Sequence, residues 1–237
     1  MGLVKDTTNE EKGYAKINLA LHVTGIQADG YHALDSIVVF TDVSDRLFFK
    51  RSLKNVVTLT GEFSKSINVR ENSILQALKL FGNGLTDRFS INLEKNLPIG
   101  AGLGGGSADA AAVIRFITNN SKHLMPSSEA LSKIGADIPA CVLSVASRVG
   151  GIGEIVRPLD ISEINLWIVL VNPDIFVSTG SIFEEVTEKY NQPLESFIDL
   201  SSTDQFIDYL KRQRNDLQTI AIKRHPEINK VLHTIEE

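Results

Sequence analysis

One segment of this 237-residue chain constrains the fold more than any other. Apolar and polar residues alternate over 89–93, which predicts a strand, and an alanine-rich helix is expected over 107–119. Between them lie five glycines within Gly100–Gly106. Glycine lets a backbone turn tightly and approach a ligand, and unpaired N–H groups at a helix start favour an anion. The segment therefore predicts a cradle for nucleotide phosphates, built from Pro98, Gly100, Gly102, Gly104, Gly105, Gly106 and Ser107.

Three other interpretations of the glycine loop differ in what they require of the sequence. A P-loop of the Walker type requires a lysine before the serine, and none stands between Gly106 and Ser107. The dinucleotide pattern G-x-G-x-x-G is present, but it requires a second parallel strand after the helix, whereas 120–135 reads as polar loop and helix. A loop used only for close packing stays open, although five glycines exceed what packing usually needs.

Composition narrows the class of protein. The net charge is −5 and no basic run is present, which argues against nucleic-acid binding. Cys141 is the only cysteine and lies in an apolar run, so we expect a packed thiol and a reducing compartment. The apolar run Leu166–Val171 is far too short to cross a bilayer, so we expect no membrane partner and a cytoplasmic protein.

The remaining periodicity predicts an α+β protein with a first domain over 1–160 and a second over 161–237. Strand-rich sequence fills the first part and helix-rich sequence the last. The further strands are expected at 14–24, 35–42, 46–51, 55–60 and 166–172. The further helices are expected at 72–82 with Asn72 as a possible N-cap, at 128–134, 180–190, 203–213 and 215–222, and from Pro226 to the end.

The alternation over 14–24 gives the first strand a polar face. Ala15 and Ile17 point one way, whereas Lys16 and Asn18, two residues apart, point the other. The strand pattern by itself is equally compatible with a solvent-exposed Lys16 and with a functional one. Asp109, in the first turn of the helix after the loop, would repel phosphate and is interpreted as structural.

At this point the chain resembles a known family. Pro98–Ala112 resembles the phosphate-binding motif of the GHMP small-molecule kinases. Further similar segments follow in the family's order over about 14–235, namely Ala15–Leu19, Ala28–Leu34, Gly135–Pro139, Gly151–Glu154, Val177–Thr179 with Phe183, and Asn215–Leu217. The resemblance is greatest to the branch whose substrate is cytidine-diphosphate methylerythritol, and together the segments are specific.

The resemblance implies two α+β domains with the active site in the cleft, and the use of ATP and Mg²⁺. It implies that Asp137 is the catalytic base toward the acceptor hydroxyl and that Lys16 is its ion-pair partner. A helix cap is the weaker interpretation of Asp137, since Pro139 would suit the first helical position. Ser107 is expected as a phosphate or Mg²⁺ contact, an N-cap, or both.

The resemblance also implies the binding of the acceptor. Asn18 would hydrogen-bond the small-molecule substrate, Tyr31 would stack on its cytosine, and His32 would read the edge of the base. Phe183 would close the other side of the base, with helix-core packing as the alternative. The other histidines show no ligand spacing, so no direct protein cluster for a metal is expected.

One part of the family pattern is missing. The family carries a further glycine motif near its C-terminus, and this chain has no glycine after Gly180. We therefore expect an incomplete C-terminal domain. Two alternatives stay open: a kinase with another alcohol as acceptor, and a nucleotide-binding remnant without catalysis. Monomer and homodimer are equally compatible with the sequence.

Overall fold

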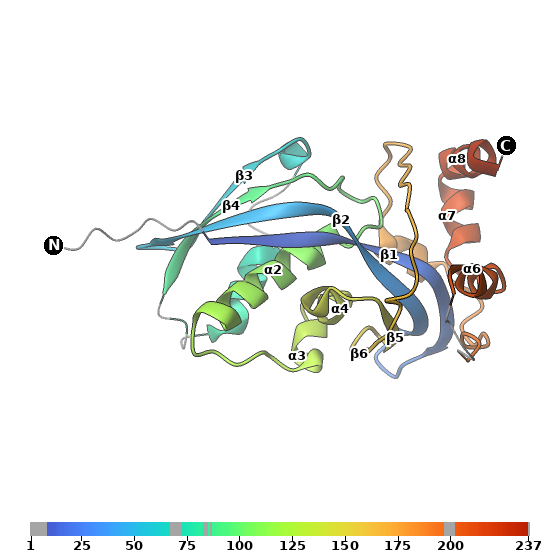
Figure 1. The fold of residues 1–237 in the computed structure, drawn as a ribbon, viewed down its shortest axis with the longest axis horizontal. Helices are drawn as coiled ribbons and strands as arrows, with labels where there is room; N and C mark the ends of the chain where they lie inside the picture. Colours follow the sequence, from blue (N-terminus) through green and yellow to red (C-terminus); the bar gives the residue numbers. More distant parts are fainter. Residues whose placement is uncertain (1–8, 67–72, 83–84, 86, 197–201, 237) are drawn as a thin grey trace. The chain divides into compact units, whose positions relative to one another are not determined.

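A computed structural model describes residues 9–66, 73–82, 85, 87–196 and 202–236 (Figure 1). Its strands are β1 (Asn9–Ile26), β2 (His32–Ser52), β3 (Val56–Thr60), β4 (Arg88–Glu94), β5 (Ser147–Gly151) and β6 (Ile155–Pro158). Its helices are η1 (Ser64–Ser66), α1 (Ser73–Leu80), α2 (Gly105–Asn120), α3 (Ser128–Ser132), α4 (Ile138–Leu143), α5 (Thr179–Glu184), α6 (Thr203–Lys211), α7 (Gln218–Arg224) and α8 (Pro226–Glu236). The α+β class predicted from the sequence is confirmed.

The described strands form one mixed sheet in the order β3-β4-β2-β5-β6, with β1 also paired to β2. β4 runs antiparallel to the second half of β2, with Phe49 opposite Ile91, and parallel to β3. The first half of β2 pairs antiparallel with β5, with Ser36 opposite Val149. β2 is therefore a long strand with a different partner at each end.

By internal contacts the chain divides into two compact units. The first comprises Met1–Lys16, Asp42–Ile99 and Leu103–Leu143, and the second comprises Ile17–Thr41, Gly100–Gly102 and Ser144–Glu237. These units are defined by packing and are not continuous in sequence, so the domain boundary expected at 160 stays a prediction.

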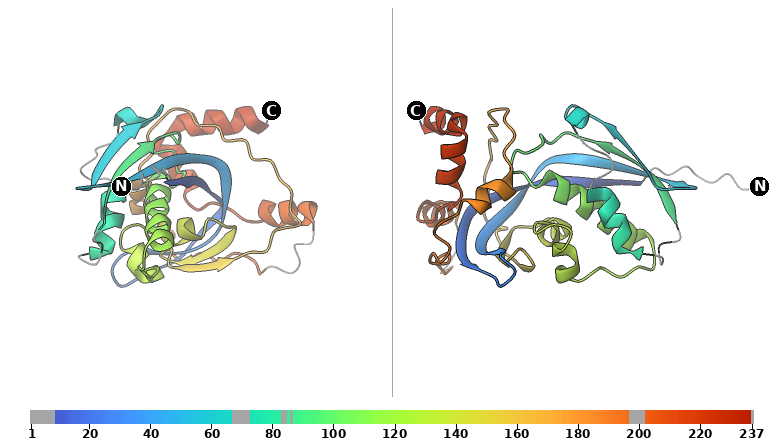
Figure 2. Two further views of the ribbon diagram at one scale, coloured as in Figure 1. Left: turned by 60° about the vertical axis from the view of Figure 1, so that its left-hand side comes forward. Right: turned by 180° about the vertical axis from the view of Figure 1, so that it is seen from behind.

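In the first unit, helices and strands enclose an aromatic core. α2 packs against both α1 and α4, and Figures 1 and 2 show α1 and α2 lying side by side. Phe49 of β2 stacks on Phe116 of α2 with ring centroids 3.8 Å apart, and Phe89 of β4 meets both rings edge-on. Such offset and edge-on pairs add to the free energy gained by burial. They hold the middle of α2 to the sheet.

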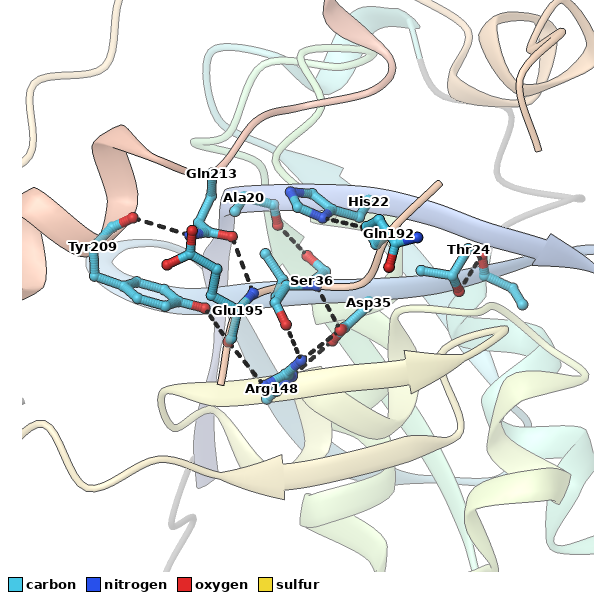
Figure 3. A network of polar contacts seen from close by, with 12 residues as sticks. Ala20, His22, Thr24, Asp35, Ser36, Arg148, Gln192, Glu195, Tyr209 and Gln213 are labelled. Atoms are coloured by element: carbon cyan, nitrogen blue, oxygen red, sulfur yellow. Dashed lines mark hydrogen bonds and ion pairs between the residues drawn. The ribbon is translucent and has the colours of Figure 1, made fainter. Parts of the chain in front are cut away.

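In the second unit, a polar network surrounds Arg148 (Figure 3). Its guanidinium group donates to both carboxylate oxygens of Asp35, at 2.7 and 2.6 Å, and to the carbonyl of Leu194 at 2.9 Å. Tyr209 donates to the carbonyl of Glu195. Bidentate charge-assisted bonds of this kind fix geometry as well as adding stability. The network holds the segment around Leu194 against β2 and β5.

Several expected elements differ in the structure. The strands expected at 35–42 and 46–51 are one strand, because both halves of β2 have sheet partners and the polar residues between them need not turn. The helix expected from Ser107 begins at Gly105, with Gly104 as its N-cap. Ser107 is therefore not the cap. Asn72, expected as the cap of α1, lies outside the described residues.

The expected strand at 166–172 is not formed. Its apolar side chains are exposed, from 41% at Leu166 to 96% at Trp167. A strand requires a partner for its backbone groups, and no strand of the described residues pairs with this segment. The prediction of a strand rests on a run of consecutive apolar residues, and such a run forms a strand only where other strands pair with it.

Burial along β1 also departs from simple alternation. Four consecutive residues, Ala20–Val23, are buried. The two residues of this run on the face expected to meet solvent are covered by later parts of the chain: Ala20 packs with Leu194 and Tyr209, and the ring of His22 contacts the carbonyl of Gln192 and the N–H of Arg214. No helix among the described residues is long and apolar enough to cross a membrane.

Candidate active site

The start of α2 is open to an anion. Its N-cap Gly104 is left-handed (φ 65°) and no side chain caps the helix. The first N–H groups of a helix have no partner within it, and together with the helix dipole they attract phosphate. The Ser73 hydroxyl donates to the Gly106 carbonyl at 2.6 Å, which fixes the first turn from α1. These features fit a bound phosphate group.

Lys16 and Asp137 form an ion pair in the first unit. The Lys16 ammonium lies 2.8 Å from Oδ1 of Asp137. The lysine side chain is 5% exposed, whereas the aspartate side chain is 42% exposed. The pair therefore presents a carboxylate to solvent while its cation is buried, as a group that must meet a substrate would require.

The ion pair lies directly against the N-cap of α2. A Cβ built on Gly104 would stand 3.3 Å from Cε of Lys16 and 3.6 Å from Oδ2 of Asp137. The backbone N–H of Lys16 also donates to the carbonyl of Leu103 at 2.9 Å. We call Gly104–Ser107 with Lys16 and Asp137 the phosphate site. It combines a helix start, a cation and a carboxylate.

The carboxylate of Asp137 does not cap helix α4. α4 begins at Ile138, one residue before Pro139, and the carbonyl of Asp137 accepts from the N–H of Cys141. The expected helix start at Pro139 was wrong by one residue. Asp137 thus occupies the cap position through its backbone, while its carboxylate is bound to Lys16.

Burial raises the pKa of the Cys141 thiol to about 12, assisted by the charge of Asp137, which agrees with a packed, unreactive cysteine.

Ser107 lies beside the segment that carries Asp137. A Cβ on Gly135 would stand 3.3 Å from Oγ of Ser107. Among the described residues, no group of three or more His, Cys, Asp or Glu side chains could hold a metal ion.

The other loop glycines belong to the second unit. Gly100 has φ 68° and a Cβ there would overlap the ring of Phe176, so only glycine fits. Its carbonyl accepts from the N–H of Val177. Gly102 is also left-handed, with φ 74°, and its Cα faces open space. Both positions have the backbone freedom that the sequence predicted.

The second unit brings two of the predicted base-binding rings together. His32, at the start of β2, and Phe183 of α5 have ring centroids 5.5 Å apart. Nε2 of His32 is buried and has no hydrogen-bond partner in the described part of the chain. Burial lowers the pKa of His32, and the charge of Lys189 acts in the same direction, so the ring is neutral near pH 7. A buried polar atom without a partner is costly, and a ligand could satisfy it.

Tyr31 and Asn18 lie in the same unit. The Tyr31 side chain is 61% exposed and makes no ring contact with His32 or Phe183 among the described residues. The amide of Asn18 donates to Oγ of Ser36 at 2.7 Å, and Ser36 donates to the carbonyl of Ala20. We call Tyr31, His32 and Phe183 the base site.

Sequence analysis missed the buried charges beneath the phosphate site. Lys95 lies between Asp45 and Asp109, and all three side chains are at most 5% exposed. Asp109 is thus structural, as expected, but through this cluster and not through the helix dipole. Lys95 lies three residues before Pro98, and nothing in the sequence linked it to Asp45.

Comparison with known proteins defines the class. The family model described as the GHMP kinases N terminal domain matches residues 72–153. A curated protein of Cereibacter sphaeroides is 39% identical over 216 residues, covering 90% of this chain and 77% of that protein. One of Paracoccus denitrificans is 40% identical over 221 residues, covering 92% and 76%. The chain therefore belongs to the GHMP kinase family, ATP-dependent phosphotransferases that act on small molecules.

Within this family the similarity is to one kind of enzyme. Both relatives are named 4-diphosphocytidyl-2-C-methyl-D-erythritol kinase. A solved structure titled 4-(cytidine 5'-diphospho)-2C-methyl-D-erythritol kinase is 26% identical, with a TM-score of 0.69 over 94% of this chain and 81% of that one. A mevalonate kinase of Methanococcus jannaschii, 17% identical with a TM-score of 0.50, shares the fold.

Proposed function

We propose that this chain transfers the γ-phosphoryl group of ATP to the 2-hydroxyl of 4-diphosphocytidyl-2-C-methyl-D-erythritol. A bond forms between the acceptor oxygen and the γ-phosphorus, and the bond from that phosphorus to the bridging oxygen of ADP breaks. The observation that carries the proposal is the meeting of the Gly104 N-cap with the Lys16–Asp137 pair. The names of the relatives supply the acceptor.

Asp137 is proposed to align the acceptor hydroxyl and to accept its proton as the new P–O bond forms. Phosphoryl transfer depends mainly on positioning and on stabilising charge, so a half-exposed carboxylate at a helix start suits the task. Lys16 is proposed to hold the carboxylate of Asp137 in place through their 2.8 Å ion pair and to stabilise the negative charge of the phosphoryl group in transit.

The start of α2 is proposed to hold the ATP phosphates through the backbone N–H groups of Gly104–Ser107. Mg²⁺, when bound with ATP, neutralises phosphate charge, and Ser107 is the residue proposed to contact it. The remaining ligands of the ion are expected from the phosphates and water, as is usual for Mg²⁺ in kinases. A reducing cytoplasmic setting is part of the same proposal.

The base site is proposed to bind the cytosine of the acceptor, and Asn18 to hydrogen-bond the substrate. The buried Nε2 of His32 has no hydrogen-bond partner among the described residues, which suits the polar edge of a base. Phe183 and Tyr31 offer aromatic faces, and stacking is worth about 1–3 kcal/mol per base. This arrangement favours an acceptor that carries a nucleobase over one that does not.

An acceptor panel tests the proposal. The chain is incubated with Mg-ATP and, separately, with 4-diphosphocytidyl-2-C-methyl-D-erythritol, 2-C-methyl-D-erythritol 4-phosphate and mevalonate, and ADP release is followed. We expect release only with the cytidine compound, with a phosphorylated product in equal amount. Equal rates with the acceptors lacking cytidine would contradict the role of the base site.

A further inference from the structure

Three buried charged side chains lie under the start of α2. Nζ of Lys95 donates to Oδ2 of Asp45 and, at 3.1 Å, to Oδ2 of Asp109. Asp45 is completely buried, and Lys95 and Asp109 are 4% and 3% exposed. We call these residues the buried cluster.

Asp45 fixes the chain where it enters the glycine loop. Its Oδ1 accepts from the backbone N–H groups of Asn96 at 2.7 Å and Leu97 at 2.8 Å. The backbone of Lys95 is held as well, since its N–H donates to the carbonyl of Thr60. The three residues before Pro98 therefore have little freedom to move.

The other side of the buried cluster fixes the chain where it leaves the loop. A Cβ on Gly105, the first residue of α2, would stand only 2.9 Å from Nζ of Lys95. Asp109, one turn further along α2, accepts from the same ammonium group. Lys95 therefore joins the entry of the glycine loop to the first two turns of the helix that follows it.

Stability alone does not explain a buried cluster of this kind. Desolvation opposes every buried charge, and apolar side chains of similar volume often stabilise a core as well or better. Oδ1 of Asp109 has no hydrogen-bond partner in the described part of the chain, which adds a further cost. What apolar packing does not provide is directional bonds on both sides of the glycine loop, from the backbone of Asn96 and Leu97 to Asp45 and from Lys95 to the side chain of Asp109.

We propose that Lys95 is a positioning residue for ATP: through Asp45 and Asp109 it sets the distance and direction between the loop entry and the start of α2. The N–H groups that bind phosphate are then held in place before ATP arrives, and binding spends less free energy on ordering them. This inference rests on the proposed use of ATP. It does not depend on the identity of the acceptor.

Nucleotide binding without an acceptor tests the inference. The affinity for the Mg²⁺ complex of a non-hydrolysable ATP analogue is measured by calorimetry at 15 °C, beside the thermal unfolding temperature. Lys95→Met is expected to weaken the affinity at least tenfold. Arg148→Met is the control, since it breaks an ion pair in the second unit whose side chains are also largely shielded, 23% and 13% exposed. It is expected to lower the unfolding temperature and to leave the affinity within twofold.

A second pair of variants keeps the test decisive if Lys95→Met does not fold. Asp109→Asn retains an oxygen that can accept from Lys95, whereas Asp109→Leu has a similar shape and no acceptor. We expect an affinity within threefold of the wild type for the first and at least a fivefold loss for the second. Unchanged affinity in Lys95→Met or Asp109→Leu would overturn the inference, as would an equal loss in Arg148→Met. Absence of kinase activity with normal nucleotide binding would instead contradict the proposed acceptor.

Discussion

The phosphate site and the base site are built in different ways. The phosphate site takes four residues from one contiguous segment, Gly104–Ser107, and its cation is buried and paired. The base site takes its residues from β2, the turn before it and α5, and Tyr31 is 61% exposed. In the proposed function, the phosphates common to all ATP-dependent transfers thus meet buried, paired support, whereas the base, which differs among acceptors, meets side chains of mixed exposure.

This difference predicts that mutations in the phosphate site and in the base site have different effects. Changes in the phosphate site alter charge and backbone placement where the phosphoryl group reacts, so they should reduce kcat or ATP affinity. Changes in the base site should act on the KM for the acceptor.

After the loss of the Asp137 carboxylate, the largest effect is expected from Lys16→Met. The substitution removes the buried cation beside Gly104 and leaves Asp137 without its partner. Loss of one group that stabilises developing charge costs roughly 10²–10³ in kcat, and we expect a fall in that range. Steady-state kinetics with both substrates measures it. Lys12→Met, an exposed lysine on the same strand, is the control, and an equal fall there would contradict the assignment.

Phe183→Ala is expected to raise the KM for the acceptor by roughly 5–150-fold, the equivalent of about 1–3 kcal/mol of stacking. The KM for ATP should change less than twofold. Phe183 also contacts the core around Leu21 and Val186, so thermal unfolding must be followed in parallel. Phe183→Tyr retains the ring and should stay near the wild type. A rise in both KM values together would show that the residue serves packing only.

Gly104→Ala is expected to weaken ATP binding about tenfold. A left-handed backbone costs a residue with a Cβ about 1–2 kcal/mol, and the new methyl group would press on Lys16. Gly82→Ala is the control, because Gly82 is also left-handed (φ 56°) but its Cβ would meet open space. Calorimetry should detect similar losses of stability in both variants and a loss of affinity in Gly104→Ala alone.

The smallest effect on catalysis is expected from Asp109→Asn, which changes the pH dependence of stability instead. Burial raises the pKa of Asp109 to about 7, with Lys95 opposing and Asp45 assisting the shift. The native state therefore holds a proton that the unfolded chain releases near pH 4, and this contribution to stability is lost as the pH rises toward 7. Asparagine cannot ionise, so the stability of the variant should rise relative to that of the wild type as the pH increases from about 4 to 7. Urea unfolding at several pH values measures the difference, and parallel curves would contradict it.

The sequence predicted the contiguous parts of the molecule well and the assembled parts less well. Strands β3 and β4 and helix α8 follow from periodicity alone, and α2 was expected within two residues of its start. The family resemblance supplied the Lys16–Asp137 and His32–Phe183 pairs, which no local pattern could join. The residues 166–172 form an apolar run typical of a buried strand, but no described strand pairs with them, because pairing is not a property of one segment.

The buried cluster shows a second limit. Asp45 and Lys95 are 50 positions apart, and each alone reads as a surface charge. Only the antiparallel pairing of β2 with β4, which sets Arg46 opposite Glu94, brings Asp45 and Lys95 together. Because burial and pairing of charges arise from the tertiary fold, the sequence offered no signal for the residue now proposed to position ATP.

One rapid-quench experiment on the wild-type chain and Asp137→Asn tests the proposed phosphoryl transfer and the role of Asp137 directly. Both proteins are mixed with Mg-ATP and 4-diphosphocytidyl-2-C-methyl-D-erythritol, and ADP and the 2-phosphate product are quantified over time. We predict equal amounts of ADP and product from the wild type and a rate lower by roughly 10²–10⁴ in the variant, with ATP binding retained. No product from a wild-type chain that binds ATP, or equal rates in both proteins, would contradict the central claim.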